Sequence, residues 1–129
     1  QFEVPNDPSL LTGTQLGQIM LRMSGYYSYT QRMLGICDAE LSLIEAEYKI
    51  RVNQKAGGIR ERVGRINQEA IEAMVLADNK ELEPLYKRKL ELSAIKIRLE
   101  SLLLIYDKFS QTLSRELSRR TMEAQLNVG

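Results

Sequence analysis

Apolar or small residues in the first half of the chain recur at alternating spacings of four and three residues. The row contains Leu16, Met20, Met23, Tyr27, Thr30, Leu34, Cys37, Leu41, Ile44 and Tyr48. A heptad spacing of this kind keeps one face of a helix against a second helix over several turns. With Thr14 as the N-cap, it predicts a long helix over residues 14–56.

The residues before this helix follow a different pattern. Pro5 and Pro8 restrict the backbone of residues 1–11 and of the positions before each proline to non-helical conformations. We therefore predict an extended N-terminal arm, with Phe2 and Val4 as candidates for docking on a neighbouring subunit.

A pair of glycines interrupts the pattern after residue 56. Gly57 and Gly58 lose much conformational entropy on ordering, so we predict a turn there. Helical spacing resumes beyond the pair and predicts a shorter connecting helix over residues 59–77, on the evidence of Ile59, Val63, Ile66, Ala70 and Ala73.

The last helix has its own boundary. Asp78 and Glu81 have the spacing of a capping box, and Pro84 suits a first helical turn. We predict a helix over residues 79–126, because a second heptad row runs along it. That row contains Leu92, Ile95, Leu99, Leu102, Tyr106, Phe109, Leu113 and Leu117.

These patterns predict an all-α fold, in which residues 12–129 form a single domain of two long heptad-patterned helices joined by a shorter helical connector. Both long helices carry apolar residues beyond their rows, so we expect the chain to self-associate into a homo-oligomer. We assign the contacts between copies to residues of the second row, namely Leu92, Ile95, Leu99, Leu102, Tyr106, Phe109 and Leu113.

Composition argues against most catalytic chemistry. The 129 residues contain no His and one Cys, which argues against zinc sites and His-dependent triads, and no phosphate-binding glycine motif is present. Carboxylates such as Asp38 and Glu45 indicate a solvated helix surface rather than a metal site. Cys37 lies in the first heptad row, which favours a buried structural role. We therefore predict a protein that is not an enzyme and that needs no cofactor or metal.

Location is constrained by similar observations. The sequence has neither an apolar run long enough to span a membrane nor a visible signal peptide. The single Cys suits a reducing compartment. These features predict a cytoplasmic protein without a membrane partner.

The distribution of charge is more informative than the net charge of +1. Residues 49–65 hold six basic residues against one acidic residue, Glu61; the basic ones are Lys49, Arg51, Lys55, Arg60, Arg62 and Arg65. Such a segment can contact phosphates, because each neutralised phosphate releases counterions. The alternative is a solvated surface or a bridge to acidic residues of another subunit. Lys87, Arg88 and Lys89 form a lesser cluster, diluted by nearby glutamates.

Two blocks of the sequence resemble the UvsY-type recombination mediators of tailed phages. The first is Leu43-Ile-Glu-Ala-Glu-Tyr-Lys-Ile-Arg-Val-Asn-Gln-Lys55, followed by a basic, glycine-bearing segment. The second, Val75-Leu-Ala-Asp-Asn-Lys-Glu-Leu82, leads into a long helix that ends in Ser114-Arg-Glu-Leu-Ser-Arg-Arg120.

This resemblance implies a small helical protein that forms ring-like oligomers, binds single-stranded DNA and helps a RecA-like recombinase displace single-strand-binding protein. It implies no hydrolytic activity. A Lys-x-Arg pair contributes to strand binding in that family; the matching positions are Asn53 and Lys55, of which only the second is charged. The competing hypothesis is a structural or adaptor oligomer that binds protein partners without nucleic acid.

Overall fold

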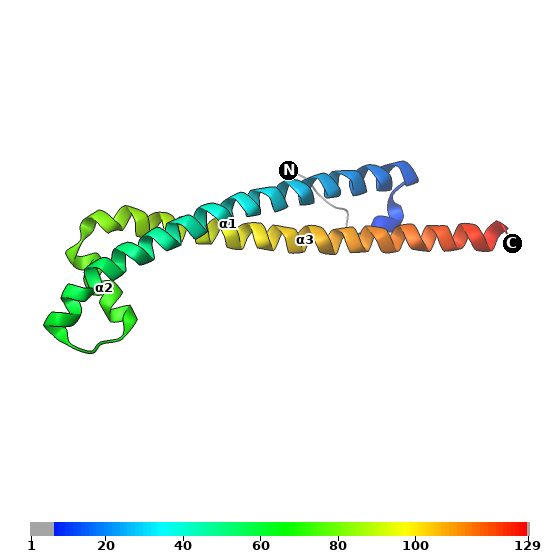
Figure 1. Cartoon of the computed structure of the whole chain (residues 1–129). Coiled ribbons are helices and arrows are strands. Elements are labelled where there is room, and N and C mark those ends of the chain that lie inside the picture. Colours follow the sequence, from blue (N-terminus) through cyan, green and yellow to red (C-terminus); the bar gives the residue numbers. More distant parts are fainter. Residues whose placement is uncertain (1–6, 129) are drawn as a thin grey trace. The chain divides into compact units, whose positions relative to one another are not determined.

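The computed structural model describes residues 7–128, and all regular secondary structure in this part of the chain is helical (Figure 1). Three α-helices, α1 (Gly13–Val63), α2 (Gln68–Asp78) and α3 (Glu83–Val128), are accompanied by the short 3-10 helices η1 (Pro8–Leu10) and η2 (Lys80–Leu82). The predicted all-α class is confirmed. Phe2 and Val4 of the predicted arm lie outside the described residues.

The start of α1 is fixed by a reciprocal cap. The Thr12 hydroxyl accepts a hydrogen bond from the Gln15 amide at 3.1 Å, while the Gln15 side chain accepts one from the Thr12 amide at 2.9 Å. This pairing satisfies amides that the first helical turn leaves free. The predicted N-cap, Thr14, is wrong, because it lies inside the first turn.

The predicted turn at Gly57 and Gly58 is also wrong, because α1 continues through both glycines to Val63. Buried residues on either side of the pair, Ala56 and Ile59, pack in the same hydrophobic cluster. That packing offsets the cost of about 1 kcal/mol that each helical glycine carries. The chain turns instead at Gly64, whose φ of 76° suits glycine and whose amide donates to the Arg60 carbonyl at 3.0 Å.

Alanine at position 57 or 58 is expected to raise the free energy of unfolding by about 1 kcal/mol each. A Cβ at either site meets nothing within 4 Å, so the substitutions add helix propensity without a clash. Urea denaturation followed by circular dichroism measures the change. Gly64→Ala is the control, and its positive φ predicts a loss of stability instead. Destabilisation by Gly57→Ala would contradict the continuous helix.

The boundary between α2 and α3 differs from the predicted capping box. Asp78 is the last residue of α2 and pairs with Arg62 instead of capping α3. The side-chain amide of Asn79 donates to the Val75 carbonyl at 2.9 Å and closes the C-terminus of α2. The start of α2 also differs from the prediction. Because α1 continues to Val63, α2 begins at Gln68 rather than at Ile59, with Asn67 as its N-cap.

The chain divides into two compact units. Among the described residues, the first contains residues 7–34 and 98–128, and in it α1 and α3 run antiparallel (Figure 1). Leu16, Met23 and Leu113 are buried between them. The ring of Tyr26 stacks on that of Tyr106, with centroids 6.0 Å apart.

A charged cluster holds the first described residues in this unit. Arg120 donates hydrogen bonds to the carbonyls of Pro8 and Leu11 and to the Glu116 carboxylate. Hydrogen bonds from Arg119 and Arg120 lower the pKa of Glu116 to about 2. The cluster thereby fixes η1 against α3.

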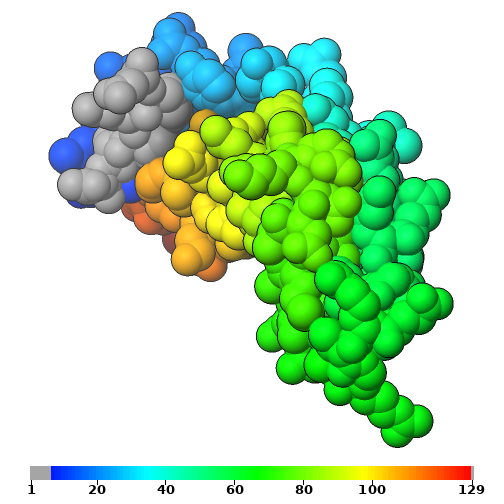
Figure 2. Space-filling view, turned by 90° about the vertical axis from the view of Figure 1, so that its left-hand side faces the viewer, coloured from blue at the N-terminus to red at the C-terminus, as the bar shows by residue number. Residues whose placement is uncertain are grey.

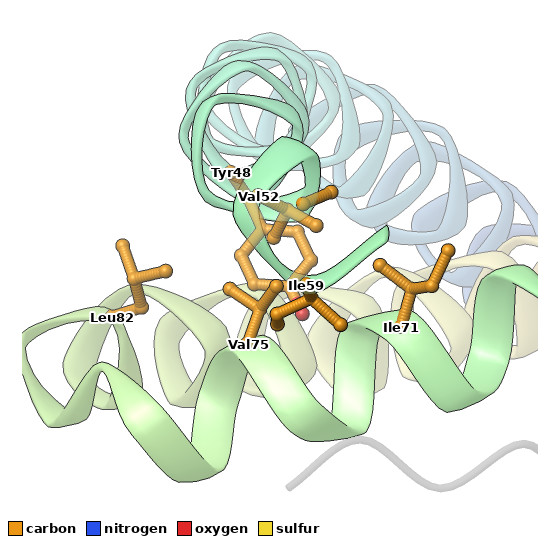
Figure 3. Packing of buried hydrophobic residues seen from close by; sticks show 7 residues of the cluster. Tyr48, Val52, Ile59, Ile71, Val75 and Leu82 are labelled. Atoms are coloured by element: carbon orange, nitrogen blue, oxygen red, sulfur yellow. The ribbon is translucent and has the colours of Figure 1, made fainter. Parts of the chain in front are cut away.

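The second unit covers residues 35–97 and holds the larger hydrophobic cluster (Figure 3). Side chains of α1 meet those of α2 and η2 here; the buried members are Tyr48, Val52, Ala56, Ile59, Ile71, Val75 and Leu82. Ion pairs tie α1 to α3, with Glu40 and Arg88 2.8 Å apart and Asp38 and Lys96 3.1 Å apart. Cys37, predicted to be buried, is 5% exposed and donates to the Leu92 carbonyl.

Candidate functional site

The predicted basic segment, residues 49–65, comprises the last turns of α1 and the start of the loop that follows it. All six of its basic side chains are exposed. The green segment in Figure 2 contains this part of the chain and lies at the surface of the molecule. The segment is therefore accessible to a ligand.

Helical geometry divides the six predicted residues into two groups. At about 100° per residue, Lys49 and Arg60 project from one flank of α1, which we call the open flank. Arg51, Lys55 and Arg62 project from another, the paired flank, about 150° away by the same geometry. Arg65 follows Gly64 in the loop. The structure thus does not bring all six together on one face.

The paired flank is largely neutralised within the chain. Arg51 forms an ion pair with Glu47 at 2.8 Å, and Arg62 forms one with Asp78 at 3.1 Å. Within residues 7–128, Lys55 makes no ion pair. Exposed ion pairs are weak, so a competing polyanion could still displace them.

The open flank borders a cleft of about 400 Å³ between α1 and α2. Residues from three helices line it; they are Glu45, Tyr48, Lys49, Val52, Asn53, Gln68, Glu72 and Lys89. Arg60 lies beside it and donates a hydrogen bond to the Gln68 side chain at 3.2 Å. Lys49 and Lys89 therefore line the cleft, and Arg60 lies beside it.

Tyr48 forms part of the wall of this cleft and is 2% exposed. The Lys89 ammonium lies 4.7 Å from the centroid of its ring, and the Tyr86 ring packs against it. Burial, followed by the charge of Glu72, raises the pKa of Tyr48 to about 12. Its hydroxyl has no hydrogen-bond partner among the described residues.

Tyr48→Phe is expected to stabilise the second unit by about 1 kcal/mol, because an unpaired buried hydroxyl costs roughly 1–3 kcal/mol. Urea denaturation of the two proteins measures the difference. Tyr29→Phe is the control, since Tyr29 is 55% exposed and should show no change. A loss of stability in Tyr48→Phe would mean that the hydroxyl has a partner.

The composition of the cleft favours a polar group over a phosphate inside it. Glu45 and Glu72 balance the charges of Lys49 and Lys89, and their carboxylates repel anions. The amides of Asn53 and Gln68 supply both donors and acceptors. Phosphates would instead contact Lys49, Arg60 and Lys89 from outside the cleft.

Sequence reasoning missed two contributors to this flank. Lys89 belongs to the lesser basic cluster, but nothing in the sequence places it beside Lys49. Gln68 has no distinguishing pattern at all. The grouping of Lys49 with Arg60 could be found only by knowing that α1 is continuous, because the predicted turn at Gly57 separated these two residues.

The residues predicted to join copies of the chain have mixed environments. Leu92 and Leu113 are buried within the chain, and Leu99 and Tyr106 are half-buried. Ile95, Leu102 and Phe109 remain exposed at 37–40%. These last three stay candidates for contacts between copies.

Two further observations concern other kinds of site. In the described part of the chain, no group of three or more His, Cys, Asp or Glu side chains is arranged to hold a metal ion. No α-helix within residues 7–128 is long and apolar enough to cross a membrane. The open flank with its cleft is therefore the strongest candidate site.

Comparisons with known proteins add no assignment. No protein-family model matches the chain, and no curated protein or solved structure matches it either.

Proposed function

We propose that the chain binds single-stranded DNA through the open flank of α1. The observation that carries this proposal is the grouping of Lys49, Arg60 and Lys89 around a cleft lined by the amides of Asn53 and Gln68. Phosphates of a strand lie along the cations, and an unstacked base presents its edge to the amides. Single strands can use such a site because their bases are free.

We further propose, from the sequence resemblance, that the protein is a recombination mediator of the UvsY type. It would act in the cytoplasm as a homo-oligomer, with a ring as the expected form. Several copies would bind one strand and help to load a RecA-like recombinase onto DNA covered by single-strand-binding protein. Linking several weak sites raises the overall affinity through effective concentration.

Fluorescence anisotropy of a labelled oligothymidine across a salt series tests the proposal. Each phosphate contact contributes about −0.7 to the slope of log affinity against log salt, so three contacts in one chain give a slope of about −2. A duplex of the same length should bind more weakly. Absent binding, or binding that salt does not change, would overturn the proposal.

The adaptor hypothesis retains one supporting observation. Many large apolar side chains are exposed, among them Leu43 at 73% and Ile97 at 65%, and such surfaces usually contact other proteins. This hypothesis predicts oligomers that do not bind DNA, so the anisotropy measurement also decides between the two functions.

A further inference from the structure

The outer side of α1 in the second unit is unlike an ordinary solvent-facing helix surface. Ile36, Leu43 and Ile50 follow one another at intervals of seven residues and are 56%, 73% and 58% exposed. Successive positions seven apart lie close together on one side of a helix, so the three form an aliphatic row. The buried residues Cys37, Leu41 and Tyr48 lie on the opposite side of α1.

Small residues accompany this row. Gly35, Ala39, Ser42 and Ala46 are exposed and, with the aliphatic row, occupy an arc of about 120° around α1. Within residues 35–46 the charged side chains lie outside this arc, and two of them, Asp38 and Glu40, are paired with Lys96 and Arg88 of α3. The low profile of the small residues allows another helix to approach closely. We call this arc the outer face.

The aliphatic side chains of this row are open to a partner, because each of the three is more than half exposed. From Ile36 to Ile50 the row extends along about 21 Å of α1, at roughly 1.5 Å per residue. Exposed apolar surface that is continuous over several helical turns usually marks a contact with another protein.

We propose that the outer face of α1 packs, antiparallel, on the outer face of a second copy of this chain. The aliphatic row fits the same row of a second copy when a two-fold axis passes beside Leu43. Because the three residues are equally spaced, Leu43 then contacts Leu43 of the second copy, and Ile36 contacts Ile50 of the second copy. The helix dipoles then oppose each other, which is favourable.

Charge selects the antiparallel orientation over the parallel one. The basic segment, with six basic residues against one acidic residue, follows the row along α1. A parallel pair would place two such segments side by side, where they repel. An antiparallel pair separates them to opposite ends of the contact. The inference rests on the self-association included in the proposed function and assigns one of its contacts. A two-fold contact joins copies in pairs, so a ring would need a second, different contact between the pairs. The test of the inference needs no DNA.

Disulfide cross-linking of single-cysteine variants tests this arrangement. In a Cys37→Ser background, Leu43→Cys should form a disulfide-linked dimer by itself under oxidising conditions. Ile36→Cys and Ile50→Cys should each form little disulfide-linked dimer alone but should cross-link when mixed. Dimers of Ile36→Cys alone, together with no product from the mixture, would overturn the antiparallel arrangement.

The mass in solution provides the second test. Leu43→Arg should reduce the mass measured by light scattering, while circular dichroism shows an unchanged helix content because the side chain is exposed. Ile97→Arg, on α3 and 65% exposed, is the matched control and should leave the mass unaltered. An unchanged mass for Leu43→Arg would overturn the proposed interface. Salt-dependent binding of oligothymidine by that variant would show that the DNA proposal stands independently.

Discussion

Replacing Lys49, Arg60 and Lys89 together with alanine is expected to weaken the binding of oligothymidine about a hundredfold, at roughly 1 kcal/mol for each exposed contact. The slope of log affinity against log salt should also fall in magnitude by about 2, because three phosphate contacts disappear. The physical reason is that none of these three cations is in an ion pair within residues 7–128. Glu45 and Glu72 lie in the same cleft as Lys49 and Lys89, but no ion pair holds any of the three cations, so each can turn toward a phosphate outside the cleft.

The chain supplies a matched control for this variant. Alanine at Arg51, Lys55 and Arg62 removes the same number of positive charges from the same helix, but from the paired flank. Arg51 and Arg62 are already neutralised by Glu47 and Asp78, so we expect at most about a tenfold loss, essentially that of one exposed contact. Anisotropy at several salt concentrations measures both variants.

Equal losses in the two variants would contradict an assignment to the open flank and would indicate a diffuse attraction to the whole segment. A greater loss from the paired flank would transfer the site there. Circular dichroism of each variant must match that of the original protein, because Lys89 also contacts the ring of Tyr48. Without that match, a lower affinity would report a damaged second unit.

The helical fold followed from the sequence because its strongest signal, apolar spacing, is local. Most buried positions of α1 belong to the predicted row; Leu16, Met23, Cys37 and Tyr48 are examples. The row on α3 is harder to define by spacing, because apolar residues stand at adjacent positions there. Leu103 is half-buried, whereas its neighbour Leu102 is 38% exposed. Spacing alone does not choose between two such neighbours.

The errors have a common cause in tertiary contacts. Two adjacent glycines predict a turn when only the local backbone is considered, but Ala56 and Ile59 are buried against α2 and keep the helix intact. Asp78 has the residue type and spacing of an N-cap, yet Arg62, sixteen positions earlier, pairs with it instead. Contacts over such separations cannot be derived from a single sequence without an alignment or a fold.

The candidate site was predicted only in part for the same reason. The charge count gave the position of the basic segment along the chain, and the structure places its six basic side chains at the surface. Its division into two flanks depends on α1 being continuous from Lys49 to Arg62. The contribution of Lys89 depends on the position of α3. A count of charges contains neither kind of information.

Packing in the second unit determines whether the open flank exists at all, so a core substitution there is expected to have the largest effect on stability. Ile71 is 1% exposed in the cluster between α1 and α2 and lies one turn after Gln68. Ile71→Ala is expected to lower the free energy of unfolding by about 3 kcal/mol, because it removes buried methyl groups and leaves a cavity. The control is Ile97→Ala, which makes the same change at a side chain that is 65% exposed and should shift stability by less than about 0.5 kcal/mol.

Urea denaturation of the two variants measures this contrast, and anisotropy with oligothymidine connects it to function. Because α2 carries Gln68 and Glu72 into the cleft, a loosened α2 should weaken DNA binding by Ile71→Ala even though no positive charge is removed. Ile97→Ala should bind normally. Equal stability of the two variants would contradict the buried position of Ile71. Full binding by a destabilised Ile71→Ala would mean that the cations of α1 and α3 bind the strand without the cleft, and the proposed role of the amides would then be wrong.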